Sequence, residues 1–378
     1  MDLFAALNSA QKLIYITGWS VYTQISLLRG DEADQNEDSN VGELLKRKAA
    51  EGVRVLVMTW NEKSNDCGLL EGMMGTHDQA TLQYFRGTDV ICTNVQRAKD
   101  SWLGLGGQFV STLYTHHQKT VVCDTAVSQD TGDRRLVGFI GGVDITNGRF
   151  DSPAFPLFSS LFSQHAGDFY QNCTTGCTAM SGPREPWHDI HARVEGPVVM
   201  DIVRNFAGGW IKQNPAMCDD LLELEGQGDL LLEEPAEEVE GEGGPWVVQL
   251  LRSITIDSAV MDAERAAEIN MFSKYGRLID NSIQMQYVNL IRNAQSFIYI
   301  ENQYFLGSAY SWLSDQEVLA QHVIPREITQ RIIQKMELGE SFHCYVTIPM
   351  YPEGDPASVP SQEILRWQFR TMESMYAR

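Results

Sequence analysis

The sequence predicts an α/β fold in which mixed, mainly parallel sheets are flanked by helices. Short, nearly all-apolar strands alternate with helical patterns, as in residues 41–50 followed by residues 53–58. The same order recurs in residues 328–338 and 342–348, and a glycine separates helix from strand both times. Strands of this kind are buried on both faces, so we expect the functional residues beyond their carboxyl ends.

An internal repeat predicts two similar lobes. Residues 10–16 match residues 294–300 at five of seven positions, with an offset of 284. The helix–glycine–strand units follow at nearly the same offset, since Gly52 and Gly339 are 287 positions apart. Two pairs of elements in one order indicate a duplicated α/β unit, although helix–glycine–strand order is also common in unrelated α/β proteins.

The charge of the chain is concentrated in one stretch. The 378 residues include 29 Lys+Arg and 50 Asp+Glu, which gives a net charge of −21. Eleven of the acidic residues, and no basic residue, lie between Lys212 and Arg252. Residues 216–245 are therefore predicted to be an acidic linker or insertion. This predicted linker separates a first lobe, residues 1–215, from the start of a second lobe, residues 246–378.

Composition excludes several classes of protein. With 43% hydrophobic residues the chain is globular rather than disordered. No apolar run is long enough to span a membrane, and the acidity disfavours binding to nucleic acid. Seven scattered cysteines predict a reducing, cytoplasmic compartment. The spacings of Cys173 with Cys177, and of His188 with His191, are too weak to indicate zinc, so no metal site is predicted.

One segment carries a pattern suited to phosphate chemistry. His117 and Lys119 are two residues apart in a β-like run, which places them on one face of a strand. The run continues into a predicted hairpin that ends at Gly141 and Gly142. A lysine would screen the charge of a phosphodiester, and a neutral imidazole could attack its phosphorus. The alternative is that both side chains are surface residues at a strand end.

Here the sequence resembles the phospholipase D superfamily. His117, Lys119 and Asp124 fill its H-x-K-x4-D signature. The surrounding sequence is similar to that of the plant-type, calcium-dependent phospholipase D enzymes over nearly the whole chain except the acidic stretch. The similar segments are residues 13–22, 113–120, 139–144, 182–191, 300–308 and 349–354.

The resemblance implies a two-lobed fold with one such motif in each lobe and the two histidines at one site. It implies that one histidine attacks the phosphodiester of a phospholipid such as phosphatidylcholine, while the other protonates the departing alcohol. Water then releases phosphatidic acid, or a primary alcohol takes the place of water. By analogy His117 is the nucleophile and Lys119 holds the phosphate, whereas Asp124 is expected to buttress the site.

The resemblance also assigns the residues that bind substrate and the partners. Gly141, Gly142 and Asp144 are expected to line the pocket, and Trp187 and His188 its wall. Polar side chains at a strand end, Glu301, Asn302 and Gln303, are expected to reach it. Calcium is implied as a cofactor, chiefly through an N-terminal C2 domain that this chain lacks. Peripheral association with a phospholipid membrane surface is implied as well.

The sequence departs from the family pattern in one respect. Nothing after residue 284 matches the second H-x-K-x4-D, and the offset of 284 places the counterpart of His117 near position 401, beyond Arg378. We therefore expect a second lobe that is incomplete, and we do not expect a homodimer to restore it. Two other functions stay open: an inactive fragment that binds lipid or a partner, and another phosphodiesterase such as a nuclease, which the charge disfavours.

Overall fold

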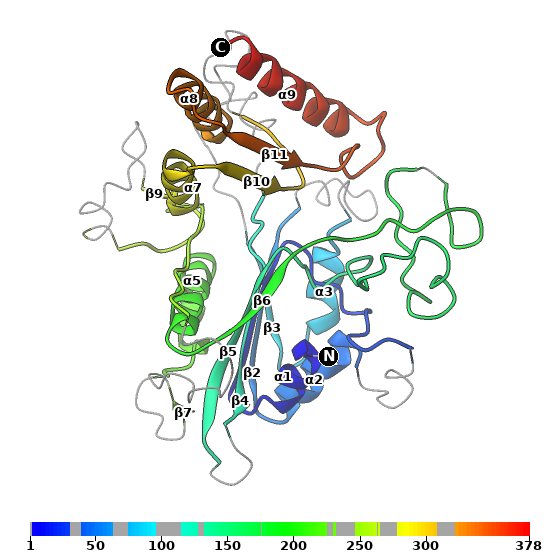
Figure 1. Ribbon diagram of the computed structural model, residues 1–378. Coiled ribbons are helices and arrows are strands. Elements are labelled where there is room, and N and C mark those ends of the chain that lie inside the picture. Colours follow the sequence, from blue (N-terminus) through cyan, green and yellow to red (C-terminus); the bar gives the residue numbers. More distant parts are fainter. Residues whose placement is uncertain are drawn as a thin grey trace, which may run out of the picture. The chain divides into compact units, whose positions relative to one another are not determined.

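The structure is a computed structural model that divides into two compact units (Figure 1). The first unit comprises Met1–Phe169, Pro186–Leu250 and Ile254–Leu278, and the second comprises Tyr170–Glu185, Leu251–Ser253 and Ile279–Arg378. The described residues are 2–30, 39–62, 75–95, 115–127, 132–174, 176–224, 230–231, 246–262, 264, 278–307 and 322–378. The predicted linker lies largely outside them, and the division into lobes at residues 216–245 stays a prediction.

The first unit is built on a mixed sheet with the strand order β3-β2-β1-β4-β5-β6. Its strands are β1 (Leu13–Gly18), β2 (Arg54–Trp60), β3 (Ile91–Val95), β4 (Thr120–Ala126), β5 (Arg134–Gly141) and β6 (His191–Glu195), and the short β7 (Leu230–Leu231) pairs with β5. Strands β1 to β3 are parallel because helices connect them, whereas β4 to β6 are antiparallel. The predicted α/β class and the hairpin before Gly141 are confirmed.

Helices cover both faces of this sheet. On one face α1 (Asp2–Ser9), α2 (Val41–Ala50) and α3 (Asp78–Phe85) enclose a core with Ile14, Ile16, Val55 and Val57. On the other face α5 (Val198–Gln213) packs against Tyr15, whose ring stacks on Phe206 with centroids 4.8 Å apart. A 3-10 helix, η3 (Pro215–Asp220), follows α5. The side chains of each strand alternate between two buried surfaces, which explains the nearly all-apolar strand sequences.

The second unit repeats the start of the first on a smaller scale. It contains α7 (Ser282–Asn293), β10 (Phe297–Glu301), α8 (Ile324–Glu337), β11 (His343–Thr347) and α9 (Val359–Tyr376). Strands β10 and β11 are parallel, as β1 and β2 are. Their inner face packs Ile298 and Ile300 against Ile291 and Ile328. The predicted duplication of helix and strand order is therefore present. Two-residue strands, β8 (Ile254–Thr255) and β9 (Ile279–Asp280), complete the described elements.

Among the described residues, no helix combines the length and the apolar character that crossing a membrane requires.

Candidate active site

The H-x-K segment lies where the parallel strands of the first unit end. Thr17 near the carboxyl end of β1 pairs with Thr120 at the start of the antiparallel β4, so the residues before Thr120 reach the same sheet edge. The prediction that His117 and Lys119 belong to the strand is wrong, because β4 begins at Thr120 and both residues precede it. Because residues 117–119 are not hydrogen-bonded within the sheet, their side chains can turn toward neighbouring loops.

Lys119 is held by a buried carboxylate. Its Nζ lies 3.0 Å from Asp144 Oδ2 and donates to the His117 carbonyl oxygen at 3.2 Å, and both side chains of the ion pair are buried. Asp144 Oδ1 accepts the backbone N–H groups of Trp19 at 2.9 Å and Ser20 at 3.2 Å. Burial lowers the pKa of Lys119 and raises that of Asp144, and their mutual attraction opposes both shifts. The ion pair thus fixes a cation beside the backbone of His117.

Three glycines permit the close packing around this pair. A Cβ on Gly18 would lie 3.2 Å from Asp144 Oδ1, at the turn that presents the two N–H donors. A Cβ on Gly141 would lie 2.3 Å from the Ile190 carbonyl oxygen, and one on Gly142 would lie 2.2 Å from Asp189 Oδ1. Side chains at these positions would push the 189–190 segment away. The structure therefore brings the predicted Gly141, Gly142 and Asp144 together with Lys119.

The imidazole of His117 sits beside an aromatic pair. Its ring makes an edge contact with Trp19 at 6.0 Å between centroids, and Trp19 stacks on Trp60 at 6.2 Å. Burial first, and then the positive charge of Lys119, lowers the pKa of His117 to about 4. The residue nevertheless keeps an exposed surface. His117 is therefore a neutral, accessible base at neutral pH.

Arg149 is a second cation near His117 that the sequence analysis did not identify. Its guanidinium lies 3.7 Å from the centre of the Trp187 ring, and the side chain is buried. Its charge also lowers the pKa of both His117 and Lys119. A basic residue five positions after Asp144, in so acidic a chain, was the available signal.

The predicted wall residues contact this cation and the following loop. The Trp187 backbone N–H donates to Asp151 Oδ2 at 2.7 Å, and its indole N–H donates to Asp189. His188 is exposed and stacks on Phe155, with ring centroids 3.6 Å apart. Trp187 thus lies against Arg149, whereas His188 packs on Phe155.

His191 is a second histidine near Lys119, and the sequence analysis did not assign it to the site. Its Nδ1 accepts the Val143 N–H at 3.3 Å. Burial lowers the pKa of His191, and the charge of Lys119 lowers it further while that of Asp189 raises it. Its place in a look-alike segment was the only signal in the sequence.

Asp124 lies at the opposite end of β4 from His117. Its carboxylate accepts the backbone N–H groups of Gln11, Lys12 and Leu13, at 2.8 to 3.3 Å, and pairs with the buried Arg134. It therefore clamps the start of β1 onto β4. Its expected role in buttressing the site stays a prediction.

Glu301 is the last residue of β10 in the second unit, Asn302 and Gln303 follow it, and all three are exposed. The Asn302 N–H donates to the Thr347 carbonyl oxygen at 3.1 Å, and Glu301 accepts the Tyr299 hydroxyl at 2.9 Å. These contacts lie within the second unit, so a role in substrate binding stays a prediction.

The described residues do not form a calcium cage. Nowhere in the described ranges do three His, Cys, Asp or Glu side chains gather in a way that could hold a metal ion. Most of the acidic stretch from residue 225 to 245 lies outside those ranges. We therefore derive no step through calcium, and its role stays a prediction.

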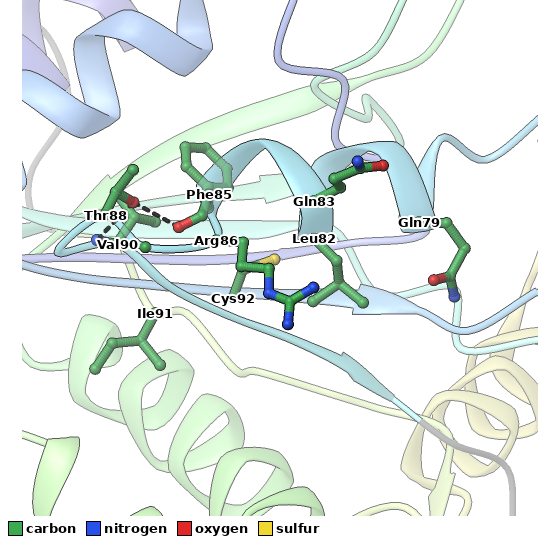
Figure 2. Close-up of a pocket in the computed structure, with 10 residues that line it drawn as sticks. Gln79, Leu82, Gln83, Phe85, Arg86, Thr88, Val90, Ile91 and Cys92 are labelled. Carbon is green, nitrogen blue, oxygen red and sulfur yellow. Dashed lines mark hydrogen bonds between the residues drawn. The ribbon is translucent and has the colours of Figure 1, made fainter.

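A hollow of about 700 Å³ lies between α3 and β3, away from these residues (Figure 2). Side chains of α3 and of the start of β3 line it, including Leu82, Phe85 and Cys92. Burial raises the pKa of Cys92 to about 12, so this thiol stays protonated. No pair of acid and base faces the hollow among its lining residues, and we assign it no chemistry.

Comparisons with known proteins point to one family. A family model described as Phospholipase D matches residues 6–378. The chain is 45% identical over 389 residues to phospholipase D alpha 2 of Oryza sativa subsp. japonica, across 99% of this chain and 48% of that protein. It is 46% identical to phospholipase D alpha 1 of Zea mays, across 99% and 47%, and 44% identical to phospholipase D alpha 1 of Arabidopsis thaliana, across 99% and 48%. The chain thus spans about half the length of these relatives.

Proposed function

The chain belongs to the phospholipase D family, and we propose that its first unit carries the nucleophilic half of a site that hydrolyses glycerophospholipids such as phosphatidylcholine. The products are phosphatidic acid and the free head-group alcohol. One observation carries this proposal: a neutral, accessible His117 lies beside the cation of Lys119, which Asp144 holds in place.

The proposed reaction divides between these residues. A ring nitrogen of His117 attacks phosphorus, and the bond from phosphorus to the head-group oxygen breaks. Lys119 and Arg149 offset the negative charge that grows on the phosphoryl oxygens. The departing alkoxide takes a proton from a general acid. Water then cleaves the phosphohistidine and frees the imidazole, and a primary alcohol in place of water gives transphosphatidylation.

The reaction also needs a general acid that protonates the departing alkoxide. The family mechanism uses a second H-x-K-x4-D, and this sequence contains the motif once, at His117. We propose that the second imidazole comes from outside these 378 residues. The single motif also favours a second candidate function, in which the chain binds phospholipid at a membrane surface without hydrolysing it. Calcium would then act at the membrane rather than at His117.

Choline release from phosphatidylcholine micelles, with calcium present, tests the proposal. Water has to replace the second imidazole as the proton donor in this assay, so we expect only slow release by the wild type. We expect a loss of about a thousandfold or more in His117→Ala, and a loss in Lys119→Ala. His343→Ala is the matched control, because this exposed histidine belongs to β11 of the second unit.

Each outcome has a distinct meaning. Release that survives His117→Ala would overturn the assignment of the nucleophile. No release from a folded wild-type chain, together with binding to the micelles, would favour the second candidate function. A radiolabelled phosphatidyl group trapped on the wild type, and absent from His117→Ala, would support the first step even if choline release stops at one equivalent per chain.

A further inference from the structure

We propose that residues 152–167 form a membrane-contacting loop that seats Phe158 and Phe162 in the surface of a phosphatidylcholine bilayer. The loop belongs to the first unit and follows Asp144 and Arg149 along the chain. The proposal rests on the proposed function, because it supplies the lipid surface from which that site would take its substrate.

The loop exposes large apolar side chains. Phe158 is 59% exposed and Phe162 is 72% exposed, and Leu157 beside them is 44% exposed. Leu161 between them is buried. Leu161 therefore packs into the protein, whereas its apolar neighbours face the surroundings. Their exposure forgoes a favourable free energy, because full burial of one Phe side chain contributes roughly 1.5–3 kcal/mol. Exposed apolar side chains gathered in one segment are typical of an interaction surface.

The loop carries no formal charge. Residues 152–167 contain no Asp, Glu, Lys or Arg, in a chain of which 21% is charged. Its one titratable side chain, His165, is 1% exposed. The whole chain has a net charge of −21, and the negative phosphates of lipids would repel most of its acidic surface. An uncharged, aromatic loop is the part of such a protein that enters the interface of a zwitterionic bilayer most easily.

The loop is held in one conformation by its own hydrogen bonds. The ring of His165 contacts Ser160 Oγ at 2.7 Å and the Phe150 carbonyl oxygen at 3.1 Å. At the end of the loop, Asp168 accepts the Gly148 N–H at 2.7 Å and pairs with Arg29 at 2.8 Å. Because the backbone is already ordered, binding to lipid would require little further loss of conformational entropy.

The loop is continuous with the wall of the candidate site. Phe155 stacks on His188, and Asp151 accepts the backbone N–H of Trp187, whose ring contacts Arg149. Ile190, whose carbonyl oxygen packs against Gly141, is itself 87% exposed. Apolar surface thus borders the cations that would bind the phosphodiester. A lipid could keep its acyl chains in the bilayer while its head group meets the site.

Flotation with vesicles of dioleoyl phosphatidylcholine tests this loop without requiring activity. We expect the wild type to float with the vesicles and the variant Phe158→Ser/Phe162→Ser to bind about tenfold more weakly. Met336→Ser/Leu338→Ser is the matched control, since it removes two exposed apolar side chains at the end of α8. We expect the control to float like the wild type.

A second variant guards against misfolding. Ser159→Glu/Ser163→Glu places negative charges at two exposed positions of the loop and leaves both phenylalanines in place. We expect it to weaken flotation as well, with an unchanged circular dichroism spectrum. Equal flotation of the wild type and both loop variants would overturn the proposal, as would a wild type that does not bind these vesicles.

Hydrolysis of dihexanoyl phosphatidylcholine below its micellar concentration separates the two proposals. If the loop acts only on the membrane, Phe158→Ser/Phe162→Ser should cleave this dissolved substrate at the wild-type rate and lose activity on vesicles. An equal loss on both substrates would contradict a membrane role. A wild type that cleaves neither substrate would count against the proposed function, and flotation would still decide the role of the loop.

Discussion

Strands β1 and β2 of the first unit and strands β10 and β11 of the second have the same parallel pairing but different surroundings. The sequence repeat aligns Tyr15 with Tyr299, and the registers align their partners, Leu56 and Tyr345. Tyr15 and Leu56 are at most 1% exposed, whereas Tyr299 and Tyr345 are 57% and 53% exposed. The same face of the same motif is core in one unit and surface in the other.

The difference shows which parts of the fold are locally encoded. In the first unit α5 covers this face, with Phe206 against Tyr15. In the part of the second unit that the structure describes, the corresponding aromatic face is open. The strands form there nonetheless, because their other face packs on α7 and α8 through Ile291, Ile300 and Ile328. One covered face is enough to align two parallel strands.

Substitution at the aligned tyrosines is the strongest test of this comparison. Tyr15→Ala removes a ring from a filled core and should lower the free energy of unfolding of the first unit by about 3–5 kcal/mol. Tyr299→Ala should change that of the second unit by about 0.5 kcal/mol or less. Hydrogen exchange of the β1 and β10 amides under mild denaturant would report on each unit separately. Similar losses for both variants would show that the face of β10 is covered in solution.

The segments that precede the two strands are also held differently. In the first unit the buried Asp124 accepts three backbone N–H groups at the start of β1, whereas in the second unit the Arg331 guanidinium donates to the Ala294 carbonyl oxygen at 2.6 and 2.9 Å. Asp124→Ala should cost about 3 kcal/mol because it leaves Arg134 buried and unpaired, and Arg331→Ala about 1 kcal/mol. Urea unfolding monitored by circular dichroism would measure both.

The buried cation offers a control for this second test. Asp124→Ala/Arg134→Met removes both charges, and we expect it to recover part of the lost stability. No recovery would mean that the backbone hydrogen bonds, rather than the unpaired charge, account for the cost. A stable Asp124→Ala chain would contradict the clamp itself.

The repeat and the strand runs of the sequence predicted the fold class because both reflect local patterns. Residues 53–58 were predicted as a strand, and β2 is Arg54–Trp60. The pairing of β1 with β4 could not be predicted, since about a hundred residues separate them and no local pattern specifies antiparallel contact across such a distance. The exposure of Tyr299 was equally invisible, because its sequence matches that of the buried Tyr15.

The motif singled out His117 and Lys119, and the family resemblance singled out Asp144, but neither could assign their contacts. The ion pair of Lys119 with Asp144 depends on a turn at Gly18 that only the fold brings near. Arg149 was missed because its importance comes from the Trp187 ring and from the electrostatic field at His117, and neither has a sequence pattern. The charge-free loop after residue 151 was visible in the sequence, but its exposure was not.

Acid should affect the first unit more than the second. Burial lowers the pKa of His116 and of His117 to about 4, and it also lowers that of His191. In the unfolded chain these groups titrate near 6.5, so between pH 6.5 and 4 the unfolded state binds more protons and stability falls as the pH falls. We expect a lower urea midpoint for the first unit at pH 5 than at pH 7.

A histidine variant isolates this effect from the buried carboxyl groups. Burial raises the pKa of Asp144 and Asp78, which opposes the loss of stability in acid. His116→Gln/His191→Gln should therefore show a smaller shift of the urea midpoint between pH 7 and pH 5 than the wild type. An unchanged shift would mean that these imidazoles are solvated in solution.

The smallest expected difference concerns ion pairs. In the first unit the side chains of Arg29 and Asp168 are only 11% and 4% exposed, whereas in the second unit Arg292 pairs with Glu327 from an exposed position. An exposed pair is weakened by the entropy of its side chains and by salt, because about 0.5 M NaCl shortens the Debye length to roughly 4 Å. Glu327→Gln should therefore lower the melting temperature slightly at low salt and not at all at high salt. Asp168→Asn should be destabilising at both salt concentrations, because its partners are shielded from the solvent. A salt-independent loss for Glu327→Gln would mean that α7 and α8 bury this pair in solution, and that the second unit is more enclosed than its open sheet face indicates.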